Sequence, residues 1–334
     1  MIKKLRVQNF RKHHDYSIEL QPGITVITGP NGSGKTSLIE AIYVALHGKS
    51  WRSSLEEVLR DGSNWWRIDV DFTNGEKRVV RYSDNIKTFE IDGKKLTCLP
   101  AKLKKPVVLF EPNDLNLLYG SPARRRDFID NFIAQVEPQH GVNLRKFERV
   151  LRQRNNLLKQ GAGRGDLFVW DIQFADLAEK IISSRQIWVK EINQDLSAEY
   201  SKIASHDEKV EMKYQPPHRT RQQIITELNK EYQNSLPYTS SGPQTHDVIF
   251  KIRGHSAKNT ASRGENRTII FAAIKMMINI LHKNFNEVYI LFDDIDSELD
   301  QSRQAGLEDS FAGYNLIATT ISPNNKNHHN SIEL

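Results

Sequence analysis

Short runs in which apolar and polar residues alternate dominate the first third of the chain. Residues 2–8 and 16–20 alternate well enough to form two strands of a hairpin or an edge sheet. Three further short strands, separated by turn signals such as Asn74-Gly75, are expected at residues 67–72, 78–82 and 88–91. Continuous apolar runs predict buried strands at residues 24–28 and 106–110.

Helical periodicity replaces this alternation near residue 120. Ser121-Pro122 predicts a helix start, because serine is a preferred N-cap and proline suits the first helical position. Apolar residues then recur at helical spacing to about residue 204, and the glycine-rich stretch 161–165 interrupts them. This pattern predicts an αα-hairpin within a mostly helical insertion.

Strand and helix patterns are mixed in the last third of the chain. Strands are expected at residues 210–214, 247–252, 288–292 and 315–319, and helices at about 220–232 and 268–282. We therefore expect one α/β unit interrupted by an insertion. The first α/β part is predicted at residues 1–119 and the helical lobe at residues 120–205. A second α/β part is predicted at residues 206–321, followed by a flexible tail at residues 322–334.

The composition is that of an ordinary globular protein, with 38% hydrophobic and 26% charged residues among 334. No apolar run reaches the roughly 18 residues of a membrane span, so we expect no membrane contact. The single cysteine, Cys98, excludes an internal disulfide and fits a reducing cytoplasm. The net charge of +6 mildly favours a polyanionic partner.

The strongest chemical signal is a phosphate-loop motif between an apolar strand and a helix. Every fixed position of the pattern G-x-x-x-x-G-K-[ST] is present in Gly29, Pro30, Asn31, Gly32, Ser33, Gly34, Lys35 and Thr36. Such a loop directs backbone N–H groups and a helix N-terminus at one spot, which suits a polyphosphate. We expect these residues and Ser37 to bind a polyphosphate, with Lys35 at the β- and γ-phosphates and the Thr36 hydroxyl on Mg²⁺.

A second signal is the apolar strand at residues 288–292, which ends in Asp293 and Asp294. An apolar central strand that ends in a carboxylate is typical of a Walker B element, and ligands collect at the carboxyl ends of such strands. We expect Asp293 to hold Mg²⁺ and Asp294 to orient or deprotonate the attacking water. Without the phosphate loop, a strand followed by an acidic turn would explain the pattern equally well.

A third motif precedes the last long helix. A serine and a glycine at a helix N-terminus can receive a γ-phosphate, and this sequence has Ser262, Arg263, Gly264, Glu265, Asn266 and Arg267 there. A signature of this kind normally acts on nucleotide held by another subunit. A simple N-cap at Ser262 would also account for the motif.

The order of these motifs, followed by Ser297-Glu298-Leu299-Asp300, resembles the ABC-type ATPases of the SMC class. Further blocks resemble the RecF family of bacterial DNA repair proteins over residues 1 to about 320. These blocks are Asn9-Phe10-Arg11, Gly48-Lys49-Ser50-Trp51-Arg52, Phe110-Glu111-Pro112-Asn113-Asp114-Leu115, residues 120–126 and residues 151–159.

The resemblance implies an α/β fold, an ABC-type ATPase head with an inserted helical lobe. It also implies a weak DNA-stimulated ATPase that dimerises with ATP and binds gapped DNA. Such proteins act with RecR and RecO and promote RecA loading. By resemblance, Arg11 and Arg52 border the nucleotide, and Glu111 to Asp114 lies in the Q-loop region. Thr319-Thr320 takes the place of the switch histidine of other ABC ATPases. The D-loop is formed by Ser297, Glu298, Leu299 and Asp300.

The sequence departs from the family at its signature. Glutamines are usual where Glu265 and Asn266 stand, and a carboxylate there would repel a γ-phosphate unless it points away or pairs with Arg263 or Arg267. The chain also lacks the usual His-Arg after Gly242-Pro243. These departures bear on the rate of hydrolysis and on the affinity of the dimer.

Positive charge concentrates in the helical insertion and favours contact with DNA phosphates over a merely solvated helix face. The expected DNA-binding residues are Arg124, Arg125, Arg126, Arg145, Lys146, Arg149, Arg152 and Arg154. No element that reads base sequence is recognisable. Two alternatives remain open, which are a DNA-binding scaffold with little ATP turnover and the ATPase subunit of a membrane transporter.

Overall fold

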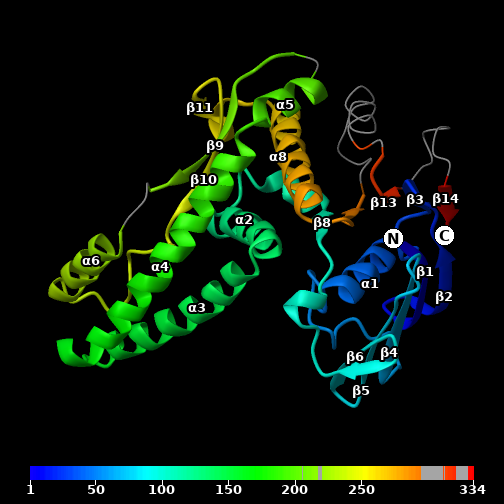
Figure 1. Cartoon of the computed structure of the whole chain (residues 1–334), viewed down its shortest axis with the longest axis horizontal. Coiled ribbons are helices and arrows are strands. Elements are labelled where there is room, and N and C mark those ends of the chain that lie inside the picture. The colour runs from blue at the N-terminus through cyan, green and yellow to red at the C-terminus, as the bar shows by residue number, and fades with distance from the viewer. Residues whose placement is uncertain (205, 217–219, 295–310, 312, 321–329) are drawn as a thin grey trace. The chain divides into compact units, whose positions relative to one another are not determined.

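The computed structural model describes residues 1–204, 206–216, 220–294, 311, 313–320 and 330–334. The chain forms two compact units (Figure 1). Unit 1 comprises Met1–Asp114 and Ile278–Leu334, and unit 2 comprises Leu115–Met277. Unit 2 is therefore an insertion in unit 1, as the sequence predicts, although its bounds differ from the predicted ones.

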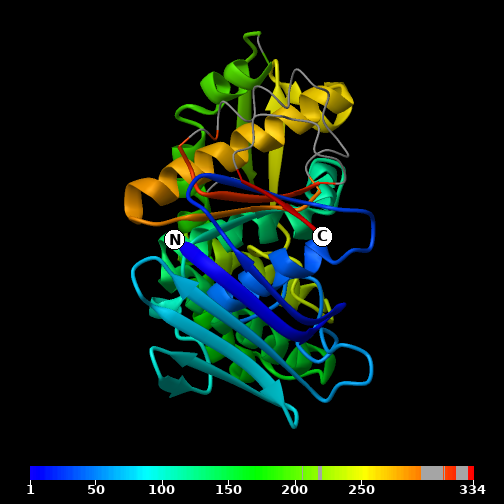
Figure 2. The same ribbon diagram turned by 90° about the vertical axis from the view of Figure 1, so that its right-hand side faces the viewer.

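Unit 1 contains a six-stranded antiparallel sheet in the order β2-β1-β4-β5-β6-β7. Figure 2 shows its strands as blue and cyan arrows. Its strands are β1 (Ile2–Phe10), β2 (His13–Glu19), β4 (Trp65–Phe72), β5 (Lys77–Ser83), β6 (Ile86–Ile91) and β7 (Lys94–Leu96). In β4 every second side chain is buried, beginning with Trp66 and ending with Phe72. Because side chains alternate between the faces of a strand, the alternating pattern of the sequence gives this sheet one core face. The predicted hairpin and the three short strands are confirmed.

The second sheet of unit 1 is parallel and has the order β14-β3-β13-β12-β8. Its strands are β3 (Ile24–Thr28), β8 (Val107–Phe110), β12 (Tyr289–Phe292), β13 (Leu316–Thr320) and β14 (Asn330–Glu333). The apolar run that ends at Phe292 is an interior strand, buried at every residue, as parallel strands usually are. Helix α1 (Lys35–His47) contacts strands of both sheets, which explains why it is buried on nearly every side.

Unit 2 combines helices with a small antiparallel sheet in the order β11-β10-β9. Its strands are β9 (Val210–Gln215), β10 (Asp247–Ile252) and β11 (His255–Ser256). Its helices are α2 (Pro122–Val136), α3 (Pro138–Lys159), α4 (Arg164–Ile192), α5 (Leu196–Ala204), α6 (Arg221–Gln233) and α7 (Ala257–Thr260). Helix α8 (Arg263–Asn284) belongs to unit 2 up to Met277. Short 3₁₀ turns occupy Ala101–Leu103 in unit 1 and Pro112–Asn116 where the chain passes from unit 1 to unit 2.

The helices of unit 2 follow the predicted pattern. Helix α2 begins as expected, with Pro122 in its first turn and the Ser121 hydroxyl accepting a hydrogen bond from Arg124 N. Helices α3 and α4 pack side by side as the predicted αα-hairpin. None of the helices in the described part of the chain is long and apolar enough to cross a membrane.

The predicted boundary at residue 205 is wrong. The strands and helices that follow it pack on the preceding helices, because β9 contacts α4 and α5, β10 contacts α2, and α6 contacts α4. The Arg125 guanidinium on α2 also donates two hydrogen bonds of 2.8 Å to the Asp247 carboxylate on β10. Residues as far as Met277, including the signature, therefore belong to the same unit as the helical hairpin.

The prediction of a flexible tail at residues 322–334 is also wrong for its last residues. Asn330–Glu333 forms β14, which pairs in parallel with β3. Leu334 N donates to Thr28 O at 2.9 Å, and the Ile332 side chain packs against the core of unit 1. The backbone pairing orders this polar segment without requiring a strong apolar pattern. The earlier residues of the predicted tail lie outside the described ranges.

Candidate nucleotide site and signature motif

The phosphate loop connects β3 to α1 and leaves the N-terminus of α1 accessible. Gly34 is the N-cap, has φ of 107°, and supplies no side-chain cap. A β-carbon at Gly34 would lie 2.5 Å from His13 Nε2, so only glycine fits there. The first N–H groups of a helix have no partner within the helix. The loop therefore presents backbone donors that suit a phosphate.

Lys35 lies over the same loop. Its side chain is nearly buried, and Nζ donates to Gly29 O at 2.5 Å and to Pro30 O at 3.0 Å. The ammonium group is thus held at the loop and adds a positive charge to the N-terminus of α1. The role of Lys35 at the β- and γ-phosphates stays a prediction.

Asp293 lies directly after β12 and contacts the phosphate loop. Its Oδ1 accepts hydrogen bonds from Thr36 Oγ1 at 2.9 Å and from Thr319 Oγ1 at 2.8 Å. Asp294 N donates to the same Thr319 hydroxyl at 2.8 Å. The predicted meeting of the acidic strand end with the phosphate loop is therefore confirmed. Burial raises the pKa of Asp293, and the two threonine hydroxyls oppose that shift.

The pair of Thr36 and Asp293 fits a magnesium ion. Mg²⁺ prefers oxygen ligands and is usually held by one or two carboxylates together with substrate phosphates and water. Thr36 and Asp293 offer a hydroxyl and a carboxylate oxygen 2.9 Å apart. The described residues contain no group of three or more histidine, cysteine, aspartate or glutamate side chains that could hold a metal without a ligand's help.

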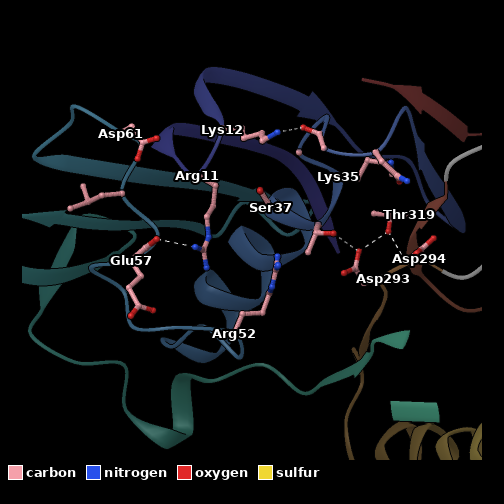
Figure 3. A pocket seen from close by; sticks show the side chains of 15 residues that line it. Arg11, Lys12, Lys35, Ser37, Arg52, Glu57, Asp61, Asp293, Asp294 and Thr319 are labelled. Atoms are coloured by element: carbon pink, nitrogen blue, oxygen red, sulfur yellow. Dashed lines mark hydrogen bonds between the residues drawn. The ribbon is translucent and has the colours of Figure 1, made fainter. Parts of the chain in front are cut away.

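These groups line one cavity of about 470 Å³ in unit 1 (Figure 3). The cavity brings together the phosphate loop, the acidic strand end and both arginines expected at the nucleotide. Its lining residues are Arg11, Lys12, Asn31, Gly32, Gly34, Lys35, Thr36, Ser37, Arg52, Glu57, Leu59, Asp61, Asp293, Asp294 and Thr319. The volume and the polar lining suit a polar ligand of nucleotide size.

Arg11 is fixed in the wall of this cavity by a buried carboxylate on α1. Its Nη2 and Nε donate to Glu40 at 2.8 and 3.0 Å, and Nη2 also donates to Ser53 Oγ at 2.6 Å. Glu40 is fully buried, and its Oε1 also accepts a hydrogen bond from Ser50 Oγ at 2.6 Å. Sequence reasoning missed Glu40, because a single glutamate in an otherwise apolar helix gives no signal of its long-range partner.

The signature turn forms a capping box at the start of α8. Ser262 Oγ accepts from Glu265 N at 3.2 Å, and Glu265 Oε2 accepts from Ser262 N at 2.7 Å. Glu265 Oε1 accepts from Arg253 Nη1 at 2.8 Å, so Arg253 pairs with this carboxylate. The partner is therefore neither Arg263 nor Arg267, the two arginines that the sequence suggests, because Arg253 lies outside the motif and nothing in the sequence links it to Glu265. Ser262 and Arg263 are exposed to solvent.

The residues expected in the Q-loop region, at the switch position and in the D-loop remain to be placed. In the Q-loop region, Glu111 Oε2 accepts a hydrogen bond from Trp51 Nε1 at 3.1 Å. Thr319, expected in place of a switch histidine, bonds to Asp293 as described above. The predicted D-loop residues Ser297, Glu298, Leu299 and Asp300 lie outside the described residues.

Two of the arginines expected to bind DNA are buried structural residues, so their prediction is wrong. Arg125 binds Asp247 and donates to the carbonyl oxygens of Leu117 and Gly120. Arg154 has no exposed surface and donates to Asp171 Oδ1 at 2.7 Å. A guanidinium that is already enclosed by carboxylate and carbonyl acceptors cannot reach a DNA phosphate.

Two more of these arginines are only partly exposed, namely Arg124 and Arg126. Arg126 Nη1 donates to His246 O at 2.6 Å. The exposed members of the set all lie on α3 and are Arg145, Lys146, Arg149 and Arg152. With Lys159, three of them form one face of the helix, because they follow one another at steps of four, three and seven residues. This exposed basic stripe consists of Arg145, Arg149, Arg152 and Lys159.

Comparison with known proteins agrees with this geometry. A family model described as an AAA domain matches residues 4–310. The DNA replication and repair protein RecF of Moorella thermoacetica is 32% identical over 324 residues, which cover 93% of this chain and 87% of that protein. The RecF protein of Agathobacter rectalis is 30% identical and covers 96% and 91% of the two chains.

Solved structures show the same fold. A structure of the recombination mediator protein RecF-ATPrS in the RecFOR pathway matches with a TM-score of 0.89 and 25% identity, covering all of this chain and 96% of that one. An SMC head bound to the C-terminal winged-helix domain of ScpA matches in fold, with a TM-score of 0.57 and 17% identity. The predicted fold class, an ABC-type ATPase head with an inserted lobe, is confirmed. The chain belongs to the RecF family of DNA replication and repair proteins.

Proposed function

We propose that this protein binds ATP with Mg²⁺ in the cavity of unit 1 and hydrolyses it slowly in response to DNA. The hydrogen bond between Thr36 and Asp293 is the observation that carries this proposal, because it joins the phosphate loop to the acidic strand end. Two similar structures, named RecF-ATPrS and RecF-ATP, support the choice of nucleotide. A bound Mg²⁺ would neutralise phosphate charge and orient the γ-phosphate.

In this arrangement different residues bind the phosphates, the metal ion and the attacking water. The N-terminus of α1 and Lys35 hold the phosphates, and Thr36 and Asp293 hold the metal ion. Asp294 orients the attacking water, because it follows Asp293 at the carboxyl end of β12, where ligands of parallel sheets collect. Arg11 and Arg52 border the nucleotide from the cavity wall.

Two copies of the chain are proposed to close on ATP. The exposed Ser262 turn of one copy would contact the γ-phosphate held by Lys35 of the other, because an accessible helix N-terminus favours an anion. Analytical ultracentrifugation tests this step, and a dimer is expected with ATP and gapped DNA but not without nucleotide. A protein that stays monomeric under both conditions would refute the proposal of a shared site.

The dimer is proposed to act at single-strand gaps beside duplex DNA. By likeness to its family, it would work with RecR and RecO and promote RecA loading, and a relative's structure is described within the RecFOR pathway. ATP would close the dimer on DNA, and hydrolysis would release it. Filter binding to gapped and blunt DNA, each with and without ATP, measures the preferred structure.

The exposed basic stripe on α3 is the proposed DNA contact. From Arg145 to Lys159 it extends about 21 Å along the helix axis, enough to follow several phosphates. Replacement of Arg145, Arg149 and Arg152 by glutamine should weaken binding to all sequences equally. The slope of log affinity against log salt should fall by up to about 0.9 for each lost phosphate contact.

Filter binding at several salt concentrations measures both effects. The matched control replaces three exposed lysines of unit 1 by glutamine, namely Lys77, Lys94 and Lys95, which changes the net charge equally. Loss of affinity in the control alone, or equal losses in both proteins, would argue against a specific role for the stripe.

A scaffold with little ATP turnover is the second candidate, and Glu265 in the signature favours it. Phosphate release measured at steady state with gapped DNA separates the two candidates. Turnover above the level of a Lys35→Met variant would exclude the scaffold.

A further inference from the structure

Arg253 occupies a tight turn close to the signature motif in unit 2. It follows β10, and the turn to β11 contains only Arg253 and Gly254, because Ile252 pairs with His255. Both turn residues have positive φ, 54° and 81°, as a type I′ hairpin turn requires. Arg253 N also donates to Lys209 O at 2.9 Å, which anchors the turn to the segment before β9. The backbone thus fixes the origin of the Arg253 side chain.

The Arg253 guanidinium joins two carboxylates. Its Nη1 donates to Glu265 Oε1 at 2.8 Å and to Glu208 Oε1 at 2.9 Å. These two hydrogen bonds raise the pKa of Arg253. Burial raises the pKa of Glu265, but its bonds from Arg253 and Ser262 outweigh burial and lower that pKa overall. Glu265 is therefore ionised at neutral pH, and Arg253 is its positive partner.

The two carboxylate oxygens of Glu265 accept hydrogen bonds from different residues. Oε1 binds Arg253, and Oε2 accepts from Ser262 N at 2.7 Å. Ser262 Oγ accepts the amide proton of Glu265, and a hydroxyl that accepts one hydrogen bond can still donate its own proton. The network thus orients the Ser262 hydroxyl, which would donate to a phosphate oxygen.

The charge of Glu265 creates a conflict that this network resolves. A carboxylate in the first turn stabilises a helix, but it opposes the approach of a phosphate to the same N-terminus. Arg253 supplies a positive charge that Glu265 shares with Glu208, and the exposed Arg263 lies in the same turn. With Arg253 removed, the carboxylate would lose a charged hydrogen bond and would be free to turn toward the incoming phosphate.

We infer that Arg253 is a positioning residue of the signature, which holds Glu265 away from the γ-phosphate and keeps Ser262 oriented toward it. This inference rests on the proposed closure of two copies on ATP. It assigns the compensation for the unusual glutamate to a residue outside the motif. Arg253 belongs to unit 2, whereas the residues that line the nucleotide cavity belong to unit 1, so its effect should be confined to closure.

Arg253→Met tests the inference in the full chain. ATP-dependent dimerisation, measured by ultracentrifugation with ATP, Mg²⁺ and gapped DNA, should weaken about tenfold or more, as expected for loss of a charged hydrogen bond. The affinity of the monomer for a fluorescent ATP analogue should stay at its original value. The double variant Arg253→Met with Glu265→Gln should restore dimerisation, because glutamine can accept from Ser262 N without a charge.

Arg221→Met is the matched control. Arg221 on α6 forms an exposed ion pair with Asp176 on α4 and has no part in the signature. The inference is overturned if Arg253→Met dimerises like the original protein, or if Glu265→Gln fails to restore dimerisation. The first result would leave the proposed function intact. Failure of the original protein to dimerise would overturn the proposed function and this inference together.

Discussion

Replacement of Lys35 by methionine should abolish the nucleotide-dependent retention of DNA. Lys35 is the ammonium group held at the phosphate loop, 2.5 Å from Gly29 O and 3.0 Å from Pro30 O. Methionine keeps most of the length of the side chain but cannot donate to the β- and γ-phosphates. Loss of a charged hydrogen bond to a buried phosphate should weaken ATP binding by at least about tenfold.

Two measurements check this expectation. Equilibrium binding of a fluorescent ATP analogue reports the direct effect, and filter binding to gapped DNA with and without ATP reports the coupled one. Lys87→Met is a matched control, because Lys87 also donates to a backbone carbonyl, Gly48 O at 3.0 Å, but does not line the cavity. If the Lys35 variant retains DNA with ATP as the original protein does, the coupling of nucleotide to DNA is refuted.

Replacement of Arg154 by methionine should lower the free energy of unfolding by about 3–5 kcal/mol, the usual cost of removing one partner from a buried ion pair. Arg154 is fully buried and donates to Asp171 at 2.7 Å and to Thr239 Oγ1 at 2.7 Å. Its Nη1 also lies 3.6 Å from the buried Glu231 carboxylate. Methionine would leave both carboxylates in the interior without this positive charge.

Urea denaturation followed by circular dichroism measures the change. Arg149→Met on the same helix is the control, because Arg149 is exposed and should change the unfolding free energy by less than about 0.5 kcal/mol. The same pair separates stability from DNA binding, since only Arg149 belongs to the exposed stripe. Equal destabilisation by the two substitutions would contradict the structural role given to Arg154.

Arg149 is exposed and Arg154 is buried, and this difference could not be predicted from the sequence. Both arginines occur in one basic run of a helix, and charge alone predicts that both face solvent. Arg154 instead points inward because Asp171 on α4 lies where α3 and α4 pack together. An acidic partner 17 residues away in sequence becomes decisive only once the helices are placed.

The phosphate loop and the acidic strand end were predictable for the opposite reason. A phosphate loop is local, since its glycines, Lys35 and Thr36 act through the backbone of one short segment. Its flanking apolar runs define β3 and α1, and the run before Asp293 defines an interior strand of a parallel sheet. Parallel strands align their carboxyl ends, so the meeting of Thr36 with Asp293 follows from the order of elements.

The sequence by itself determined the element types, the nucleotide motif and the family, because these depend on periodicity and on residues close together in the chain. The tertiary structure alone decided the bounds of unit 2, the pairing of β14 with β3, and which arginines are buried. It also decided that Arg253 pairs with Glu265. Each of these depends on contacts between distant segments, and neither hydrophobic pattern nor charge encodes which segments will meet.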